Sequence, residues 1–389
     1  MELSRLRNTL ISLCLLLLIV TGQATSAQES GVSDERFAKL ARGINLTGWF
    51  WYAPETKADI ENRFSDADFQ LIHDLGFTFV RVPIDLSFPF DEDRDDLLNP
   101  ENMALIDSGI QRLLDHDLAV VIDLHSTSLA DSDAANYSGA LEDPAFVDVF
   151  IQFWQAFAAR LKQYDPEYVF FGPMNEPVFE DDPSAWLPIQ ERLLAAIREV
   201  APEHTLIATG ALWSSRETLL EMTPLADPNI VYDFHFYDPF VFTHQGASWT
   251  WDAVESMRGV PYPSSPEAVQ SAADKLSNAE ARAAVLDYGE QRWDAAKIEA
   301  EIARVAEWAA ENQVRIICTE FGTYRPYAPD ADRALWIHDT RTAFEKYGIG
   351  WAMWEYDEGF GVVLQSGKNP IVDQPVADAL GLDSSVISR

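Results

Sequence analysis

The sequence predicts a single-domain (β/α)8 barrel, the TIM barrel, with a long insertion after its sixth strand. Eight short apolar runs alternate along the chain with segments in which apolar residues recur at helical spacing. Several of the runs are apolar at every position, as strands buried on both faces of a parallel sheet require. A doubly wound sheet is the alternative, but the glycine-rich phosphate loop typical of that fold does not follow the first run.

The eight apolar runs are the predicted strands. They are Gly43–Leu46, Phe77–Ile84, Ala119–Leu124, Tyr168–Met174, Thr205–Ala208, Ile230–Phe236, Arg315–Thr319 and Ile349–Trp354. The segments between them carry apolar residues at i, i+3 and i+4, which form one face of a helix. Two helix starts are marked by local signals, because Ser65 and Asp68 have the spacing of a capping box and Asp143 precedes Pro144.

One connection is much longer than the others. About 55 residues separate Asp238 from Trp293, between the sixth strand and the helix that follows it. The segment contains a proline-rich stretch at Val260–Pro266 and a helical stretch near Glu267–Leu286. We interpret it as an excursion over the mouth of the barrel, so residues 28–389 are expected to form one domain.

The N-terminus has the pattern of a secretory signal peptide. A basic start precedes the apolar run Leu10–Val20, and small residues follow, which predicts a signal peptide over residues 1–27 with Ala24 as an alternative cleavage point. The run is too short to span a membrane comfortably. The protein is therefore expected to be secreted or periplasmic, without a membrane anchor after cleavage. Removal of Cys14 would leave Cys318 alone, so no internal disulfide is expected.

The composition excludes some classes of partner. The chain has 28 Lys and Arg against 63 Asp and Glu, a formal charge of −35, which disfavours binding to nucleic acids and to anionic membranes. Its 12 Trp residues favour a surface that stacks flat ligands such as sugars, although most of them are expected to fill the core. A monomer is expected.

Polar and aromatic residues gather where the predicted strands end, and in a TIM barrel the chemistry lies at that end. Along the chain these residues are Trp49, Trp51, Arg81, His125, Asn175, Glu176, His235, Tyr237, Glu320 and Trp354. Glu176 and Glu320 matter most, because cleavage of a glycosidic bond needs two carboxyl groups that face one cavity. One of them protonates the leaving oxygen, and the other attacks the anomeric carbon or activates water.

Together these residues resemble glycoside hydrolase family 5, the cellulase family of retaining TIM-barrel glycosidases. The motifs are FVRVPI, IDLH, Asn175-Glu176-Pro177, His235-Phe-Tyr237, CTEFG and WAMWEYD, and the resemblance covers roughly residues 42–363. It implies that Glu176 is the general acid/base and Glu320 the nucleophile. It also implies a carboxyl separation of ~5–5.5 Å, a covalent glycosyl-enzyme intermediate and a polysaccharide or oligosaccharide substrate.

The resemblance implies further roles, one position at a time. Asn175 would bind the sugar 2-hydroxyl. Arg81 would keep Glu320 ionised, and Tyr237 would orient it.

His125 and His235 would line the reacting subsite, with His235 close to Glu176. Trp354 would form a stacking floor, and Trp49 and Trp51 are expected to contact substrate as well. No cofactor and no metal are implied.

Some residues near the strand ends are weaker candidates. Trp213, Trp249 and Trp251 would stack sugars further along a cleft or anchor loops. The acidic cluster Glu355, Asp357 and Glu358 is expected to lie mainly in a solvated loop, Asp123 to satisfy barrel hydrogen bonds, and Cys318 to be a small buried apolar residue.

Other functions stay open at this level. Within the family the function expected from the resemblance is a retaining endo-β-1,4-glucanase, and the alternatives are an exo-acting enzyme, a β-1,3-glucanase and a mannanase. A carbohydrate-binding protein that has lost catalysis is an alternative of a different class. A metal-dependent barrel hydrolase is disfavoured, because the chain offers no His-x-His pair on adjacent strands.

Overall fold

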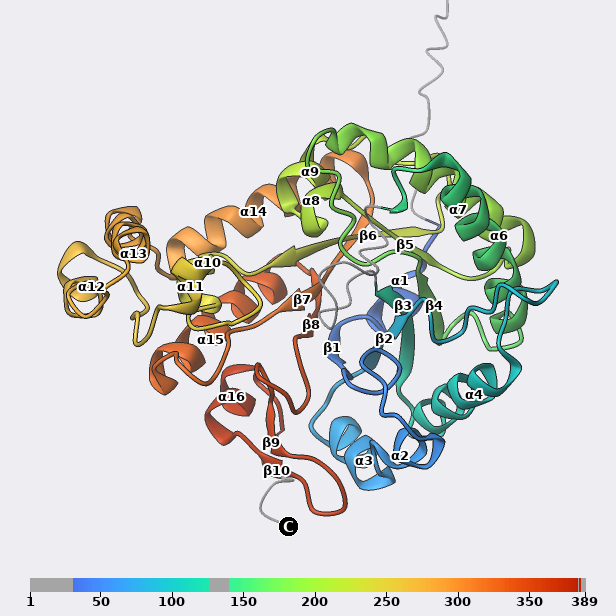
Figure 1. The fold of residues 1–389 in the computed structure, drawn as a ribbon, viewed down its shortest axis with the longest axis horizontal. Coiled ribbons are helices and arrows are strands. Elements are labelled where there is room, and N and C mark those ends of the chain that lie inside the picture. Colours follow the sequence, from blue (N-terminus) through green and yellow to red (C-terminus); the bar gives the residue numbers. More distant parts are fainter. Residues whose placement is uncertain (1–30, 126–139, 384, 386–389) are drawn as a thin grey trace, which may run out of the picture.

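The structure, a computed structural model, describes residues 31–125, 140–383 and 385, and the predicted signal peptide lies outside them. Eight parallel strands close into a barrel in sequential order, because β1 pairs with both β2 and β8 (Figure 1). The strands are β1 Arg42–Asn45, β2 Phe79–Asp85, β3 Ala119–His125, β4 Val169–Gly172, β5 Leu206–Thr209, β6 Ile230–Phe236, β7 Arg315–Phe321 and β8 Gly350–Met353. The prediction of a TIM barrel is confirmed.

Helices surround the barrel and also form excursions from it. Around the strands lie α1 Asp34–Ala38, α2 Lys57–Asn62, α3 Asp66–Asp74, α4 Pro100–Leu114, α6 Pro144–Leu161, α7 Trp186–Val200, α8 Ala211–Ser214, α9 Arg216–Glu221, α14 Ala295–Asn312 and α15 Asp330–Lys346. The insertion after β6 carries α10 Phe240–Thr243, α11 Asp252–Glu255, α12 Pro266–Ala273 and α13 Ala279–Gln291. A 3₁₀ turn, η1 Pro183–Ala185, precedes α7, and β9 Val363–Gln365, β10 Ile371–Val372 and α16 Gln374–Ala379 follow β8. None of the described helices is long and apolar enough to cross a membrane.

The helix starts that the sequence marks are present. The Ser65 side chain accepts a hydrogen bond from the backbone of Asp68, and the Asp68 side chain accepts one from the backbone of Ser65, which completes the capping box of α3. Asp143 caps α6 with Pro144 in its first turn. These caps satisfy backbone N–H groups that a helix end otherwise leaves unpaired.

Side chains inside the barrel change from apolar to polar toward the mouth. One buried layer contains Phe79, Val121, Ile207, Val231 and Ile317, which belong to a small core cluster separate from the main one. Because strand side chains alternate between faces, the residue two positions further along each strand points to the same side. Those residues are Arg81, Asp123, Thr209, Asp233 and Thr319, and all are buried. A layer of polar side chains from five strands, which we call the polar layer, therefore lies directly under the mouth.

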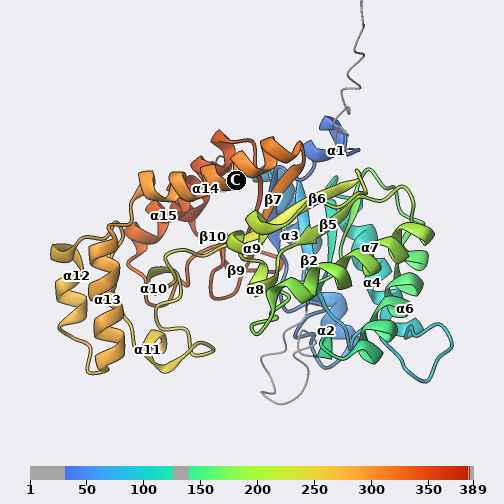
Figure 2. The same ribbon diagram turned by 90° about the horizontal axis from the view of Figure 1, so that it is seen from above.

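The insertion between Asp238 and Trp293 projects beside the barrel, with α12 and α13 at its outer edge (Figure 2). Its buried residues Tyr262 and Val285 belong to the same core cluster as the barrel residues. The expected position over the mouth holds only for the first part of the insertion, residues 238–251, whose side chains reach the barrel mouth, whereas α12 and α13 lie beside the barrel.

Backbone hydrogen bonds join the insertion to the loops that follow β7 and β8. The amide of Tyr324 donates to the carbonyl of Thr243 at 2.7 Å, and Gly259 donates to Tyr327 at 3.1 Å. On the other side, Arg325 donates to Gly359 at 2.8 Å. We call these three segments, residues 238–262, 322–329 and 354–361, the three-loop wall.

Candidate active site

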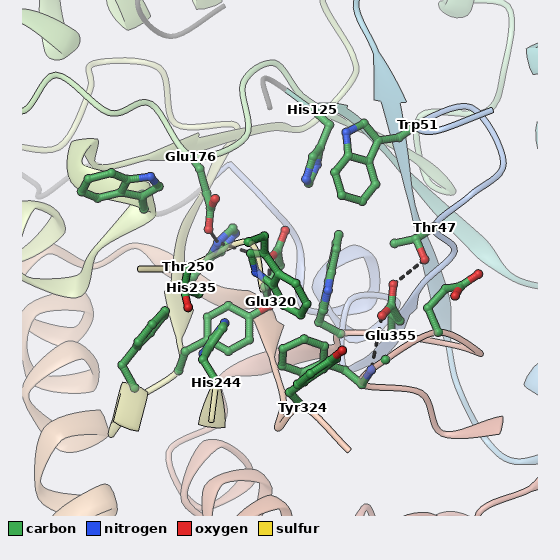
Figure 3. A pocket seen from close by; sticks show the side chains of 18 of the residues that line it. Thr47, Trp51, His125, Glu176, His235, His244, Thr250, Glu320, Tyr324 and Glu355 are labelled. Carbon is green, nitrogen blue, oxygen red and sulfur yellow. Dashed lines mark hydrogen bonds and ion pairs between the residues drawn. The ribbon is translucent and has the colours of Figure 1, made fainter. Parts of the chain in front are cut away.

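A cavity of about 1170 Å³ opens at the carboxyl ends of the strands (Figure 3). Glu176, Glu320, His125, His235 and Tyr237 all line it. They come from β3, β4, β6 and β7 or the residues just after them, so closure of the barrel is what brings them together. Seven of the ten predicted site residues line the cavity, namely these five together with Trp51 and Trp354.

Glu320 is buried and held on two sides. Arg81 Nη1 lies 2.6 Å from Glu320 Oε1, and the Tyr237 hydroxyl donates to Oε2 at 2.9 Å. Burial opposes ionisation, but His235, Arg81 and His125 outweigh it and lower the pKa of Glu320. Burial and the two glutamates raise the pKa of Tyr237, so its hydroxyl keeps the proton that it donates. Glu320 is thus an oriented carboxylate facing the cavity.

Glu176 is more accessible than Glu320, with 21% of its side chain exposed against 5%. Its Oε1 lies 2.8 Å from His235 Nδ1. His235 is buried between the two glutamates, and its Nδ1 is also 3.6 Å from Glu320 Oε2. Burial lowers the pKa of His235, but Glu320 and Glu176 prevail and raise it to about 9. An imidazolium therefore bridges two carboxyl groups that are chemically different.

The two carboxyl groups are close together. One oxygen of each, together with one nitrogen of His235, lie within 4.8 Å of one another. This proximity suits the ~5–5.5 Å separation of retaining glycosidases better than the ~6.5–9.5 Å of inverting ones. The same three groups are near enough to share a cation, but His235 is already protonated between the carboxylates and Arg81 already neutralises Glu320, so the donor set is a poor fit for a metal ion.

Arg81 belongs to the polar layer, Asn175 is hydrogen-bonded to it, and neither residue lines the cavity. Arg81 Nη2 donates to Asn175 Oδ1 at 2.6 Å and pairs with Asp123 at 2.9 Å. Asn175 Nδ2 is 3.3 Å from His125 Nε2, and His125 Nδ1 is 2.8 Å from Asp123. Arg81 is therefore too buried to bind substrate and instead supports Glu320, the role that the resemblance implies, because Nη1 and Nη2 are paired with buried side chains below the cavity. The contact of Asn175 with a sugar hydroxyl stays a prediction.

The aromatic residues after β1 separate into two groups. Trp51 lines the cavity, with its ring 5.7 Å from that of Trp354, which stacks on His125 at 5.5 Å. Trp49 does not line the cavity, and its predicted contact with substrate is wrong. It is 2% exposed, stacks on Phe50, and donates from its indole nitrogen to the carbonyl of Ile60, because α2 and the segment after it cover it.

Comparison with known proteins agrees with this geometry. The family model described as Cellulase (glycosyl hydrolase family 5) matches residues 34–359. The chain belongs to glycosyl hydrolase family 5.

Family 5 relatives include named enzymes. The chain is 28% identical to Endoglucanase 3 of Fibrobacter succinogenes, covering 87% of this chain but only 52% of that protein. It is 26% identical to Endoglucanase C of Acetivibrio thermocellus, covering 86% and 96%. Among solved structures, Thermotoga maritima Cel5A in complex with cellobiose matches with a TM-score of 0.71 and 27% identity over 89% and 98% of the two chains. A structure of the same enzyme holds mannotriose.

In this family 5 barrel the three-loop wall adds an aromatic side to the cavity that the strand pattern does not predict. Trp251 stacks on Phe240 at 5.3 Å, and Phe240 stacks on His244 at 3.9 Å. Trp249 packs edge-on against Tyr324 at 4.8 Å. Burial lowers the pKa of His244 to about 3, so the stack is uncharged at its base. The signal in the sequence is Trp249 and Trp251 themselves, two tryptophans close together in the insertion.

Trp213 lies apart from this wall and also lines the cavity. It follows β5, is 45% exposed, and shares its part of the lining with Arg216 and Glu217. Arg216 pairs with Asp238 at the start of the insertion. Trp213, Trp249 and Trp251 are therefore all exposed toward the cavity, which supports the hypothesis that they contact sugars.

Glu355 lines the cavity beside Thr47 and is 5% exposed, so its expected place in a solvated loop is wrong. The Thr47 hydroxyl donates to Oε2, and the amide of Phe360 donates to Oε1 at 3.4 Å. Burial raises the pKa of Glu355 to about 8 against these hydrogen bonds. Its neighbour Asp357 is paired with Arg63 at 2.8 Å. Asp123 and Cys318 are buried, as expected.

Proposed function

We propose that the protein is an endo-acting β-1,4-glucanase that retains anomeric configuration. The observation that carries this proposal is the contrast between two neighbouring carboxyl groups. Glu320 is buried and paired with Arg81, whereas Glu176 is partly exposed and paired with His235. A retaining mechanism needs one carboxylate that stays ionised and one carboxyl group that exchanges a proton.

In the first step, a lone pair of Glu320 attacks the anomeric carbon. The bond from that carbon to the glycosidic oxygen breaks as Glu176 gives its proton to that oxygen. The shortened chain leaves as an alcohol, and the remaining sugar is bound to Glu320 as an ester. Tyr237 and Arg81 hold the attacking carboxylate in place.

In the second step, Glu176 takes a proton from water as the water oxygen attacks the same carbon. The ester bond to Glu320 breaks, and the product is released with its original configuration after two inversions. The imidazolium of His235 stabilises the negative charge on Glu176 between the two steps.

Endo action on β-1,4-glucan is supported by the family 5 relatives named as endoglucanases and by aromatic residues on both sides of the glutamates. Trp51 and Trp354 follow β1 and β8, and Trp213 follows β5, which lies across the closed barrel from β1. Such a distribution fits a chain that extends in both directions from the cleavage point.

The test is an analysis of products from purified wild-type protein and Glu320→Gln. Substrates are soluble β-1,4-glucan, β-1,3-glucan, mixed-linkage glucan and mannan, and ¹H NMR follows the anomeric configuration of the first product. We expect a spread of β-configured oligomers from β-1,4-glucan with wild type and none with the variant. Release of only monomer or dimer from chain ends supports exo action, and preference for another polymer reassigns the substrate. Sugar binding without turnover in wild type favours a carbohydrate-binding protein.

We also propose export and action as a monomer. Export rests on the pattern of residues 1–27, and sequencing the N-terminus of protein recovered outside the cytoplasm tests it. Action as a monomer is a prediction that sedimentation velocity tests.

A further inference from the structure

Beneath His235 lies a carboxylate that the two-glutamate mechanism does not use. Asp233 is on the same strand, points to the same side of β6, and is 5% exposed. It accepts two hydrogen bonds from one residue of β7: the Thr319 amide donates to Oδ1 at 2.9 Å, and the Thr319 hydroxyl donates to Oδ2 at 2.8 Å. The Thr319 hydroxyl oxygen is also 3.2 Å from His235 Nε2.

The directions of these hydrogen bonds are fixed by counting protons. An ionised carboxylate only accepts, so the single hydroxyl proton of Thr319 goes to Asp233. The Thr319 oxygen is then left as an acceptor, and His235 Nε2 must carry the proton that faces it. Asp233 Oδ2, 3.7 Å from Nε2, favours the same arrangement electrostatically.

The other ring nitrogen faces the acid/base. With Nε2 protonated, Nδ1 is free to hold or release a second proton toward Glu176 Oε1 at 2.8 Å. The histidine is therefore either the imidazolium or the neutral Nε2–H form, and the neutral Nδ1–H form is excluded.

We propose that Asp233, acting through the Thr319 hydroxyl, keeps a proton on Nε2 of His235, so that Nδ1 is the nitrogen that shares a proton with Glu176. Asp233 and Thr319 are positioning residues in a relay that runs Asp233–Thr319–His235–Glu176. The proposal deepens the proposed function and rests on it for the role of Glu176. It adds two residues to the machinery that lie outside the predicted site.

The charges around His235 are consistent with this relay. The groups that face the ring or its partners are Glu176 and Glu320 near Nδ1, Asp233 near Nε2, and Arg81, Tyr237 and His125 around Glu320. Burial raises the pKa of Asp233 to about 6, although His235, Arg81 and Thr319 oppose this. Above that pH Asp233 is ionised, and the proton count given above applies.

The first test observes the histidine directly in the full-length protein at pH 7.5. Nitrogen-15 NMR of histidine-labelled protein, with His235→Gln to assign the signal, is expected to show a protonated Nε2. Thr319→Ser keeps the hydroxyl and is expected to keep this signal. Thr319→Val removes the acceptor, and the signal of a hydrogen-bonded Nε2–H of His235 is expected to disappear. A neutral ring protonated at Nδ1 in wild type overturns the proposal, whatever the enzyme's activity.

The second test separates proton transfer from general damage. Thr319→Val and Asp233→Asn are expected to lower kcat/KM on cello-oligosaccharides roughly tenfold, as loss of one hydrogen bond does. They are expected to leave 2,4-dinitrophenyl β-cellobioside nearly unaffected, because its leaving group needs no proton. In Asp233→Asn the basic limb of the pH profile moves to lower pH, since His235 loses a negative neighbour. Equal losses on both substrates with an unmoved profile overturn the proposal.

A matched control is available on the neighbouring strand. The Thr209 hydroxyl donates to the backbone carbonyl of Asp233 at 3.2 Å and is equally buried, but it does not contact the carboxylate. Thr209→Val is expected to behave as wild type in both tests. If wild type itself cleaves none of the glucans, the proposed function fails, while the NMR result still decides how His235 is protonated.

Discussion

Arg81 Nη1 lies 2.6 Å from Oε1 of Glu320, and both side chains are buried. The same guanidinium also reaches Asn175 and Asp123. One planar group thus fixes the nucleophile and the layer beneath it, which a lysine ammonium with a single point of charge cannot do.

Arg81→Lys is expected to lower kcat on cello-oligosaccharides at least roughly tenfold and to move the acidic limb of kcat/KM to higher pH. Arg81 is one of the cations that lower the pKa of Glu320, so weaker pairing lets the nucleophile protonate sooner. Initial rates between pH 4 and pH 8 measure both effects, with circular dichroism to confirm folding. An unmoved acidic limb in a folded variant would contradict this assignment.

Glu176→Ala is expected to lose about 10²- to 10⁴-fold in kcat/KM on cello-oligosaccharides, because the leaving alkoxide is no longer protonated. With 2,4-dinitrophenyl β-cellobioside the first step survives, and added azide accelerates turnover by attacking the ester to Glu320. The product that identifies a double displacement is β-cellobiosyl azide, measured by NMR. An α-azide, or no response to azide, would count against the assignment.

Trp251→Ala is expected to lower kcat/KM on long cello-oligosaccharides about two- to tenfold, the range of one aromatic contact. Trp251 is 54% exposed and presents a face backed by Phe240 and His244. Hydrolysis of an aryl cellobioside should change little. The matched control is Tyr347→Ala, an exposed aromatic residue outside the cavity. Equal effects of the two variants on kcat/KM would show that Trp251 does not contact the substrate.

Glu355→Gln is expected to stabilise the protein at alkaline pH. The pKa of Glu355 is about 8 in the folded protein against 4.5 for an ordinary glutamate, so the folded state holds a proton that the unfolded state releases. Stability of the wild type therefore falls as pH rises from 4.5 to 8, by on the order of a few kcal/mol. Glutamine is neutral throughout and keeps partners for Thr47 and Phe360.

Thermal unfolding at pH 5 and pH 8.5 measures this effect. The variant should gain over wild type only at the higher pH. Glu358→Gln is the control, because that side chain is 59% exposed and pairs with Arg63 at the surface. A gain of equal size at both pH values would show that ionisation of Glu355 is not the cause.

The barrel could be predicted because its strands are buried on both faces and therefore appear in the sequence as continuous apolar runs. The site could be predicted from the same runs, because Arg81 lies within one of them and Glu176 and Glu320 follow two others, at the end of the strands where a TIM barrel places its chemistry. Closure of the barrel then converts positions hundreds of residues apart into neighbours. Asp233 and Thr319 lie in the same runs, but each alone has the pattern of an ordinary buried polar residue.

The errors lie where no periodic structure sets side-chain direction. Trp49 and Trp51 are two positions apart in a loop, and only packing of Trp49 against α2 and the segment after it decides that Trp51 alone faces the cavity. Glu355 follows the last strand, and its burial depends on Thr47 and Phe360 from other loops. The insertion could be located by its length, but its aromatic stack depends on contacts made after the chain folds.

The three-loop wall limits how this cleft can be changed, by engineering or in evolution. Because Thr243, Tyr324, Arg325 and Gly359 are tied backbone to backbone, the insertion is not a detachable module. A chimaera that exchanges the insertion alone with a relative would break the hydrogen bonds at its seam and tilt Trp249 and Trp251 together. Transplants of substrate preference within the family should therefore move residues 238–262, 322–329 and 354–361 as one block.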